Sequence, residues 1–159
     1  MTPPVTLRAS QSTDAGLFYD VTEQTMRVHV IAAGGVWDDE RSRRESAEES
    51  VNPNASVIMF RGVDAGILLV ERQPHEVHLR TLYLLPGYQG RGIGGALVSA
   101  LQEEAAARRV PLRLHVLKVN PAKRFYERLG FSVEQETEYF FYMQHAAGLC
   151  RLRLPPLNR

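Results

Sequence analysis

Hydrophobic positions along the chain follow the period of a strand in some segments and the period of a helix in others. Alternating or continuous apolar runs predict strands at residues 5–9, 57–61, 66–72, 77–85, 112–116, 131–133 and 139–143. Apolar residues spaced three and four apart predict helices at residues 13–33, 92–109 and 121–129. A further helix at residues 38–50 is highly charged with little apolar stripe, so we expect it on the surface.

The order of these elements predicts the fold class. Hairpin-joined strands, one of them with its turn at Gly62-Val63-Asp64, are mixed with a single parallel crossover. This indicates an α+β protein with a central mixed, mostly antiparallel sheet flanked by about four helices. The chain has 159 residues, 44% hydrophobic and 23% charged, which is ordinary for a globular protein. We expect one domain over residues 1–145 and a C-terminal tail over residues 146–159.

Charge and cysteine content argue against several classes of protein. The formal net charge of +1 provides no electrostatic surface for nucleic acid. No apolar run reaches the ~18 residues needed to span a bilayer, and the N-terminus lacks a signal-peptide pattern. The single cysteine, Cys150, excludes an intramolecular disulfide and a multi-cysteine metal site. We therefore expect a cytoplasmic protein with no metal centre, membrane or nucleic-acid partner.

The segment from Leu82 to Gly95 carries the strongest chemical signal. An apolar strand runs into a glycine-rich turn, and an amphipathic helix follows. Glycines let the backbone approach a ligand closely, and the unpaired N–H groups at a helix N-terminus attract anions. This arrangement predicts a binding site for a phosphate-bearing cofactor.

Two common phosphate-binding motifs fit this turn poorly. Gly90, Gly92 and Gly95 match the G-x-G-x-x-G of dinucleotide-binding folds, but no acidic residue lies in the next strand, at residues 112–120, to hold a ribose. A P-loop would need Gly-Lys-Ser/Thr after the turn, and this chain has none there. A dinucleotide enzyme is therefore the weaker alternative.

Two motifs together resemble a different family. Gln89-x-x-Gly92-x-Gly94 is similar to the acetyl-CoA motif of the GNAT superfamily of N-acetyltransferases, Gln/Arg-x-x-Gly-x-Gly/Ala. The segment 119–131 resembles the second signature of that family, an asparagine after a strand and then Ala and Tyr on a short helix that ends in Gly-Phe. The resemblance is sharp over residues 76–143 and architectural before them. It implies a GNAT-like fold and transfer of the acetyl group of acetyl-CoA to a primary amine.

The resemblance also implies how the cosubstrate acetyl-CoA would bind. Its pyrophosphate would contact backbone N–H groups of the glycine turn, and its pantetheine arm would pair with a free strand edge. A backbone N–H of that strand would steady the developing oxyanion of the thioester. The turn residues are Gln89, Gly90, Arg91, Gly92, Ile93, Gly94 and Gly95, and the strand residues are Leu82, Tyr83 and Leu84.

Asn120 and Tyr126 each have a structural and a functional interpretation. Asn120, before Pro121, suits the N-cap of a helix, and the resemblance adds a hydrogen bond to the pantetheine. Tyr126 shares one helix face with Ala122, Phe125 and Leu129, at positions i, i+3, i+4 and i+7, which is compatible with a core aromatic. The resemblance implies instead that its hydroxyl group protonates the leaving thiolate.

The reaction also needs a base, because an acceptor ammonium ion must lose a proton before its nitrogen attacks. Glu76 and His78 lie two residues apart on one strand, so we expect them to share a face with Leu82 and Leu84. Either residue is a candidate base, and each could instead be an ordinary polar strand residue.

No motif selects the amine. In similar proteins the first two helices and the last strands build the acceptor pocket, and the aromatic residues with a nearby arginine here favour a small molecule over a protein. The sequence does not decide between a monomer and a homodimer. The alternative function is a non-catalytic acyl-CoA-binding or sensing module on the same fold, although the presence of Tyr126 argues against it. The candidate acceptor residues are Tyr19, His29, Trp37, Glu136, Tyr139, Phe141 and His145, with Arg80 nearby.

Overall fold

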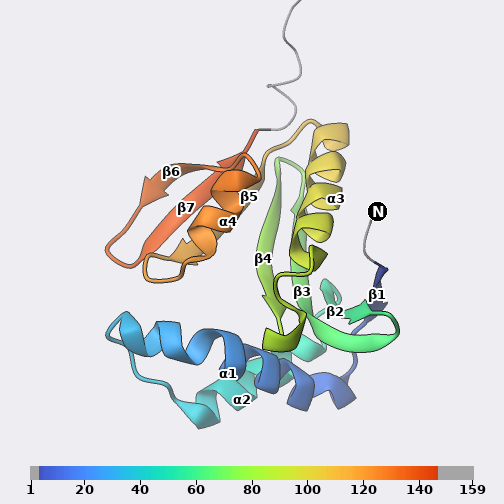
Figure 1. Cartoon of the computed structure of the whole chain (residues 1–159), viewed down its shortest axis with the longest axis vertical. Coiled ribbons are helices and arrows are strands. Elements are labelled where there is room, and N and C mark those ends of the chain that lie inside the picture. Colours follow the sequence, from blue (N-terminus) through green and yellow to red (C-terminus); the bar gives the residue numbers. More distant parts are fainter. Residues whose placement is uncertain (1–3, 147–159) are drawn as a thin grey trace, which may run out of the picture.

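Seven strands form one sheet in the computed structural model, which describes residues 4–146 (Figure 1). The strand order is β1-β2-β3-β4-β5-β7-β6, and every neighbouring pair is antiparallel except β4 and β5. This confirms the predicted α+β class with a mixed, mostly antiparallel sheet. The elements are β1 (Val5–Ala9), the 3-10 helix η1 (Ser12–Asp14), α1 (Ala15–Ala32), α2 (Asp39–Ser50), β2 (Ala55–Phe60), β3 (Val63–Gln73), β4 (Glu76–Leu84), the 3-10 helix η2 (Pro86–Tyr88), α3 (Ile93–Arg108), β5 (Leu112–Leu117), α4 (Ala122–Arg128), β6 (Ser132–Glu136) and β7 (Phe140–His145).

The largest differences from the predicted boundaries concern β3 and β6. The β2–β3 hairpin turns at Arg61 and Gly62, both with positive φ (52° and 78°), so β3 begins at Val63 rather than at residue 66. Two residues with positive φ form the tight turn that matches the twist of a hairpin. β6 extends to Glu136 and is exposed along its whole length, so no alternation of apolar residues could reveal it.

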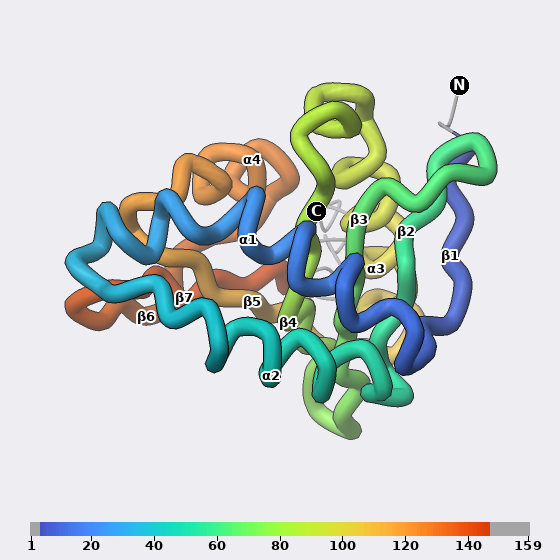
Figure 2. Tube along the Cα trace, turned by 90° about the horizontal axis from the view of Figure 1, so that it is seen from below, coloured from blue at the N-terminus to red at the C-terminus, as the bar shows by residue number. Residues whose placement is uncertain are grey.

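Two layers of helices cover opposite faces of the sheet (Figures 1 and 2). Successive residues of a strand point to opposite faces, and here they belong to different apolar clusters. Val57 and Ile67 pack with Phe18 of α1, whereas their neighbours Ile58 and Leu68 pack with α3 and α4. α2 runs beside α1 and buries only the small residues Ser46 and Ser50, which confirms its predicted surface position (Figure 2).

β4 and β5 separate soon after they begin. Within the described chain they pair only at Val77 with Leu112 and at His78 with Arg113. The register between β3 and β4 shifts so that Val70 faces Leu79 and Leu69 faces Thr81, which leaves Arg80 as the extra residue of a β-bulge. A bulge bends its strand and increases the local twist. Beyond it, β4 and β5 diverge (Figure 1).

Arg8 connects three elements at the edge of the sheet. Its guanidinium lies 2.9 Å from both carboxylate oxygens of Asp14 and 3.0 Å from an oxygen of Asp64. Asp14 is 8% exposed and also accepts a hydrogen bond of 2.8 Å from the backbone N–H of Gln11. Hydrogen bonds from Arg8 hold the pKa of Asp14 below its ordinary value.

We expect Asp14→Asn to lower the free energy of unfolding by about 2 kcal/mol at pH 7, because it breaks a buried, charge-assisted pair. A depressed folded-state pKa gives stability that is present above the unfolded pKa of about 3.9 and is lost as the carboxyl group is protonated. The difference between variant and wild type in urea denaturation should therefore shrink below about pH 4. Glu48→Gln on the exposed side of α2 is the control. A pH-independent difference would mean that the charge of Asp14 contributes nothing.

Candidate active site

The glycine turn places an uncapped helix N-terminus beside β4. Gly90 and Gly92 have φ of 71° and 78°, in the left-handed region that glycine adopts without strain. Gly92 is the N-cap of α3, no side chain caps that helix end, and its first turn carries no acidic residue. The N–H groups of this turn are therefore available to an anion.

The glycines of the turn differ in what the fold requires of them. A Cβ atom on Gly94 would lie 3.3 Å from the ring of Phe125, so close packing of α3 on α4 explains this glycine. Gly95 lies within α3, and a Cβ atom there would meet no atom of the described chain within 4 Å. The fold alone gives no reason for a glycine at position 95.

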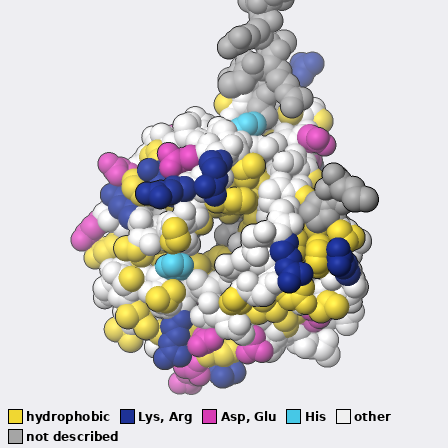
Figure 3. All heavy atoms as spheres, in the orientation of Figure 1, with side chains coloured by type: hydrophobic (Ala, Val, Ile, Leu, Met, Phe, Trp, Pro, Cys, Tyr) yellow, Lys and Arg dark blue, Asp and Glu magenta, His cyan; other side chains and the backbone are white. Residues whose placement is uncertain are grey.

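Two adjoining cavities meet between β4 and α4. The first, which we call the glycine-turn cavity, has a volume of about 480 Å³ and extends along the N-terminus of α3. The second, the inter-strand cavity, has a volume of about 620 Å³ and lies where β4 and β5 diverge. Figure 3 shows the surface hollowed between α1, α3 and α4. Both cavities are lined by Met26, Leu82, Tyr83, Asn120, Ala122 and Tyr126.

The surroundings of Tyr126 are compatible with both of its interpretations. It is 7% exposed, and its ring makes edge contacts with Phe125 (5.0 Å between ring centres) and Phe131 (5.5 Å), as expected of a core aromatic. Its side chain also lines both cavities, and its hydroxyl group has no hydrogen-bond partner within residues 4–146. Burial, followed by the neighbouring Tyr83, raises the pKa of Tyr126 above its ordinary value, so the hydroxyl group is protonated at neutral pH.

Asn120 lies one residue before the N-cap of α4, where the sequence predicted it to be the N-cap itself, because the helix begins at Ala122 rather than at Pro121. Its Oδ1 accepts a hydrogen bond of 2.9 Å from the backbone N–H of Ala122, while Pro121 itself is the N-cap. The cap uses only the oxygen of the side-chain amide. The NH₂ group of Asn120 is left to donate into the two cavities that this residue lines.

Glu76 and His78 do not lie where the sequence predicted. Val77 and Leu79 belong to the same apolar cluster as Leu82 and Leu84. Because Arg80 is the extra residue of the bulge, Glu76 and His78 point to the opposite face, and the expectation that they share a face with Leu82 and Leu84 is wrong. Neither lines either cavity, and Glu76 forms an ion pair of 3.2 Å with Arg113.

Comparison with known proteins identifies the family. A family model described as an acetyltransferase (GNAT) domain matches residues 53–133, more than half of the chain. This chain belongs to the GNAT acetyltransferase family. Uncharacterised N-acetyltransferases of Mycobacterium bovis and Mycobacterium tuberculosis are 34% identical to this GNAT protein over 102 residues. The aligned part spans 60% of the present chain and 65% of the length of those relatives.

Solved structures share the fold at low sequence identity. An acetyltransferase from Thermus thermophilus aligns with a TM-score of 0.70 and 20% identity, over 91% of this GNAT protein and 97% of that chain. The PaiA N-acetyltransferase from Thermoplasma acidophilum, solved with coenzyme A, has a TM-score of 0.67 and 18% identity, over 88% of this GNAT protein and 97% of that chain. Arabidopsis thaliana Naa50, solved with a bisubstrate analogue, has a TM-score of 0.62 and 16% identity, over 89% of this GNAT protein and 98% of that chain.

Sequence reasoning missed His115 of this GNAT protein. It lies on the polar side of β5 and lines the inter-strand cavity. Its ring centre is 5.8 Å from that of His78 on β4. A histidine alternating with Leu114 and Val116 was the available signal, but only the divergence of β4 and β5 opens a cavity beside it.

The residues predicted for the acceptor pocket are distributed over several places. Arg80 and Tyr139 line the inter-strand cavity, and His29 lines the glycine-turn cavity. Trp37 lines a separate cavity of about 230 Å³ between α1, α2 and β4. The others make contacts elsewhere: Tyr19 with Asp39, Glu136 with Lys118, Phe141 with Lys123, and His145 with Phe131.

Within residues 4–146 no helix is both long and apolar enough to cross a bilayer. The same residues contain no group of three or more His, Cys, Asp or Glu side chains that could hold a metal ion. Cys150 and the predicted tail beyond residue 146 lie outside the described residues.

Proposed function

We propose that this GNAT protein transfers the acetyl group of acetyl-CoA to a primary amine of a small molecule by direct attack in a ternary complex. The observation that carries the proposal is the meeting of the two cavities at Tyr126. One cavity begins at a helix N-terminus suited to phosphate, and the other opens on the far side of the shared residues. A cosubstrate and an acceptor can therefore approach each other from two sides.

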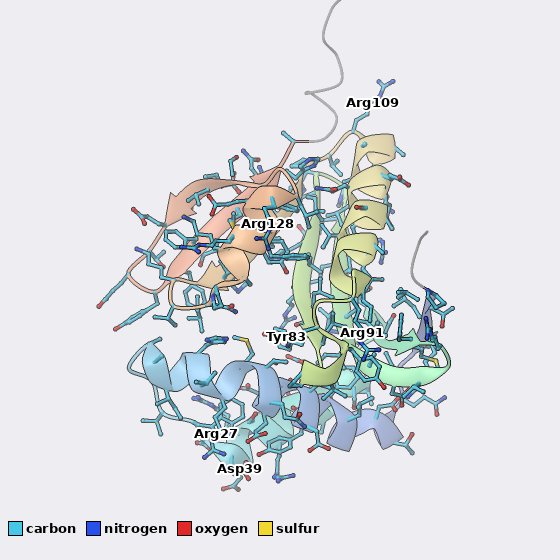
Figure 4. All side chains as sticks on the ribbon, viewed as in Figure 1. Arg27, Asp39, Tyr83, Arg91, Arg109 and Arg128 are labelled. Atoms are coloured by element: carbon cyan, nitrogen blue, oxygen red, sulfur yellow. The ribbon has the colours of Figure 1, made fainter. Side chains whose placement is uncertain are left out.

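The glycine-turn cavity suits the pyrophosphate and pantetheine of acetyl-CoA. The N–H groups of residues 89–95 would hold the pyrophosphate, with His29 and Arg128 as further lining groups. Figure 4 shows Arg128 on α4 and Tyr83 near the centre of the molecule. After His78, β4 has no pairing with β5 within the described chain, so the backbone of Leu82–Leu84 can pair with the pantetheine arm. The structures of PaiA with coenzyme A and of Naa50 with a bisubstrate analogue support this choice of cosubstrate.

The chemistry follows from the residues at the junction. The amine nitrogen attacks the carbonyl carbon of the thioester, and a backbone N–H of β4 would stabilise the oxyanion. The C–S bond then breaks, and Tyr126 donates its proton to the leaving sulfur. The amide of Asn120 would hold the pantetheine in register. Glu76 and His78 remain predicted bases, although only His78 contacts a residue of the inter-strand cavity.

A non-catalytic acyl-CoA-binding module is the second candidate. Such a module needs the glycine-turn cavity but has no use for an acceptor space. The open inter-strand cavity and the unpaired hydroxyl group of Tyr126 therefore favour an enzyme.

We expect acetyl-CoA, but not NAD, to raise the melting temperature. Ligand at 100 times its dissociation constant should add about 2.7 kcal/mol to the free energy of unfolding. Thermal unfolding measures this shift, and a panel of small amines assayed for CoA release then tests transfer. Stabilisation by NAD alone would contradict the cosubstrate. Stabilisation by acetyl-CoA with no acetylated amine would favour the binding module.

A further inference from the structure

The wall of the inter-strand cavity contains no carboxylate. None of the lining residues of the described chain is Asp or Glu, and Arg80 is the one that carries a permanent charge. The guanidinium of Arg80 contacts Glu71 at 2.9 Å on the neighbouring strand. Most of the remaining wall is apolar, with Met26, Val30 and Phe140 among its residues. An ammonium ion that entered would lose hydration without gaining an opposite charge, which costs free energy.

The nearby acids are placed outside this cavity. Glu71 is paired with Arg80, and Glu76 is paired with Arg113. Glu49 lines the separate cavity of about 230 Å³, which shares Tyr83 with the inter-strand cavity. Burial raises the pKa of Glu49, which favours its uncharged form relative to an exposed carboxyl group.

His115 is the lining group best suited to accept a proton. Its ring lies 5.8 Å from His78 of β4, and 5.4 Å and 5.6 Å from Phe140 and Tyr142 of β7, measured between ring centres. Partial desolvation by its neighbours, followed by the charges of His78 and Arg80, lowers the pKa of His115 below its ordinary value of 6.5, although the side chain is still exposed. The lowered pKa favours the neutral imidazole at pH 7, and a neutral imidazole has a nitrogen lone pair that can accept a proton.

We propose that the inter-strand cavity binds its acceptor as the neutral amine and that His115 receives the proton released after attack. The inference rests on the proposed acetyl transfer and narrows its substrate class. The amine nitrogen bonds to the thioester carbon and becomes positively charged, and one of its protons passes to His115. The C–S bond breaks and Tyr126 protonates the sulfur. Solvent then carries the proton of His115 back to the Tyr126 phenolate, so both residues are restored.

Binding of the acceptor as the neutral amine favours amines of low basicity. An alkyl ammonium such as that of lysine has a pKa of about 10.4, whereas an α-amino group beside a carbonyl has a pKa of about 7.7 to 8.0. At pH 7.5 about one alkyl amine in a thousand is neutral, compared with about a third of such α-amino groups. The acceptor class is therefore a small α-amino compound with an apolar side chain, such as an amino-acid amide, rather than a polyamine.

Two acceptors with the same phenyl group, phenethylamine and phenylalaninamide, test the substrate class. For phenethylamine, the KM should fall about tenfold per pH unit between pH 7 and 9, because the neutral fraction rises by that factor. For phenylalaninamide, the KM should level off above about pH 8. If the KM for phenethylamine does not change with pH, the ammonium ion binds, and the inference is overturned.

Variants of three histidines test the proton acceptor. With phenylalaninamide, the kcat of the wild type should fall at low pH, and the fall should lie below the ordinary histidine pKa because the pKa of His115 is lowered. His115→Gln should lower kcat about 100-fold and abolish this low-pH limb of the kcat profile. His78→Gln should keep the limb but move it to higher pH, because it removes a group that lowers the pKa of His115. His75→Gln, in the exposed β3–β4 turn, is the matched control and should leave the profile unchanged.

Each outcome decides between the alternatives. A limb that survives in His115→Gln, or that disappears in Glu76→Gln instead, would overturn the role of His115. If His115→Gln does not fold, the direction of the shift in His78→Gln decides. Failure of acetyl-CoA to stabilise the wild type would refute the proposed function itself, whereas normal acetylation with a pH-independent KM would refute only the present inference.

Discussion

Replacing Gly95 with leucine is expected to weaken acetyl-CoA binding by about 100-fold, which corresponds to about 2.7 kcal/mol, while the fold stays intact. A Cβ atom at this position meets no described atom within 4 Å, and leucine is more favourable than glycine in a helix by about 0.8 kcal/mol. The leucine side chain would instead occupy the glycine-turn cavity, where the pyrophosphate is proposed to meet the N–H groups of α3. Isothermal titration measures the affinity, and thermal unfolding of the unliganded protein checks the fold.

Gly16→Leu provides the matched control for this variant. Gly16 lies in the first turn of α1 and is exposed, and a Cβ atom there would likewise meet no described atom within 4 Å. It should gain the same helix propensity and leave the affinity for acetyl-CoA unchanged. Gly92 and Gly94 are poorer tests, because the φ of 78° and the contact with Phe125 mean that substitution also disturbs the fold. An unchanged affinity in Gly95→Leu would place the pyrophosphate away from the N-terminus of α3.

Removing the hydroxyl group of Tyr126 is expected to lower kcat about 100-fold, the low end for general acid catalysis, since a thiolate is a fair leaving group. The KM for acetyl-CoA should change little, because the proton is transferred only as the sulfur leaves. Stability should not fall in Tyr126→Phe. The ring contacts with Phe125 and Phe131 remain, and the hydroxyl group has no partner to lose among residues 4–146.

Single-turnover kinetics should measure this effect, so that product release does not hide the chemical step. Tyr88→Phe is the control, because Tyr88 contacts Phe60 and lines neither cavity. Since the pKa of Tyr126 is raised, the wild type should show no loss of its general acid until well above the ordinary tyrosine pKa of about 10. An unchanged single-turnover rate would leave Tyr126 as a core aromatic only.

The order of elements and the cofactor side of the site could be predicted from the sequence because both depend on local properties. Apolar periodicity and turn residues act over a few neighbouring positions, so β1 was predicted with its observed bounds and α1, α3 and β5 with ends within two residues. The glycine turn and the segment around Asn120 and Tyr126 are likewise contiguous in sequence, and the fold brings them to one cavity.

The acceptor side depended on tertiary structure. The bulge at Arg80 reverses the alternation along β4, so Glu76 and His78 lie on the opposite face from Leu82 and Leu84. A bulge depends on how β3 and β4 pair rather than on either strand alone. His115 lines the inter-strand cavity because β5 diverges from β4 after two paired residues. Its lowered pKa reflects partial desolvation by its neighbours and charges contributed by another strand. Strand alternation fixes which residues share a face only while the ladder is regular, and here the ladder is interrupted beside the proposed acceptor site.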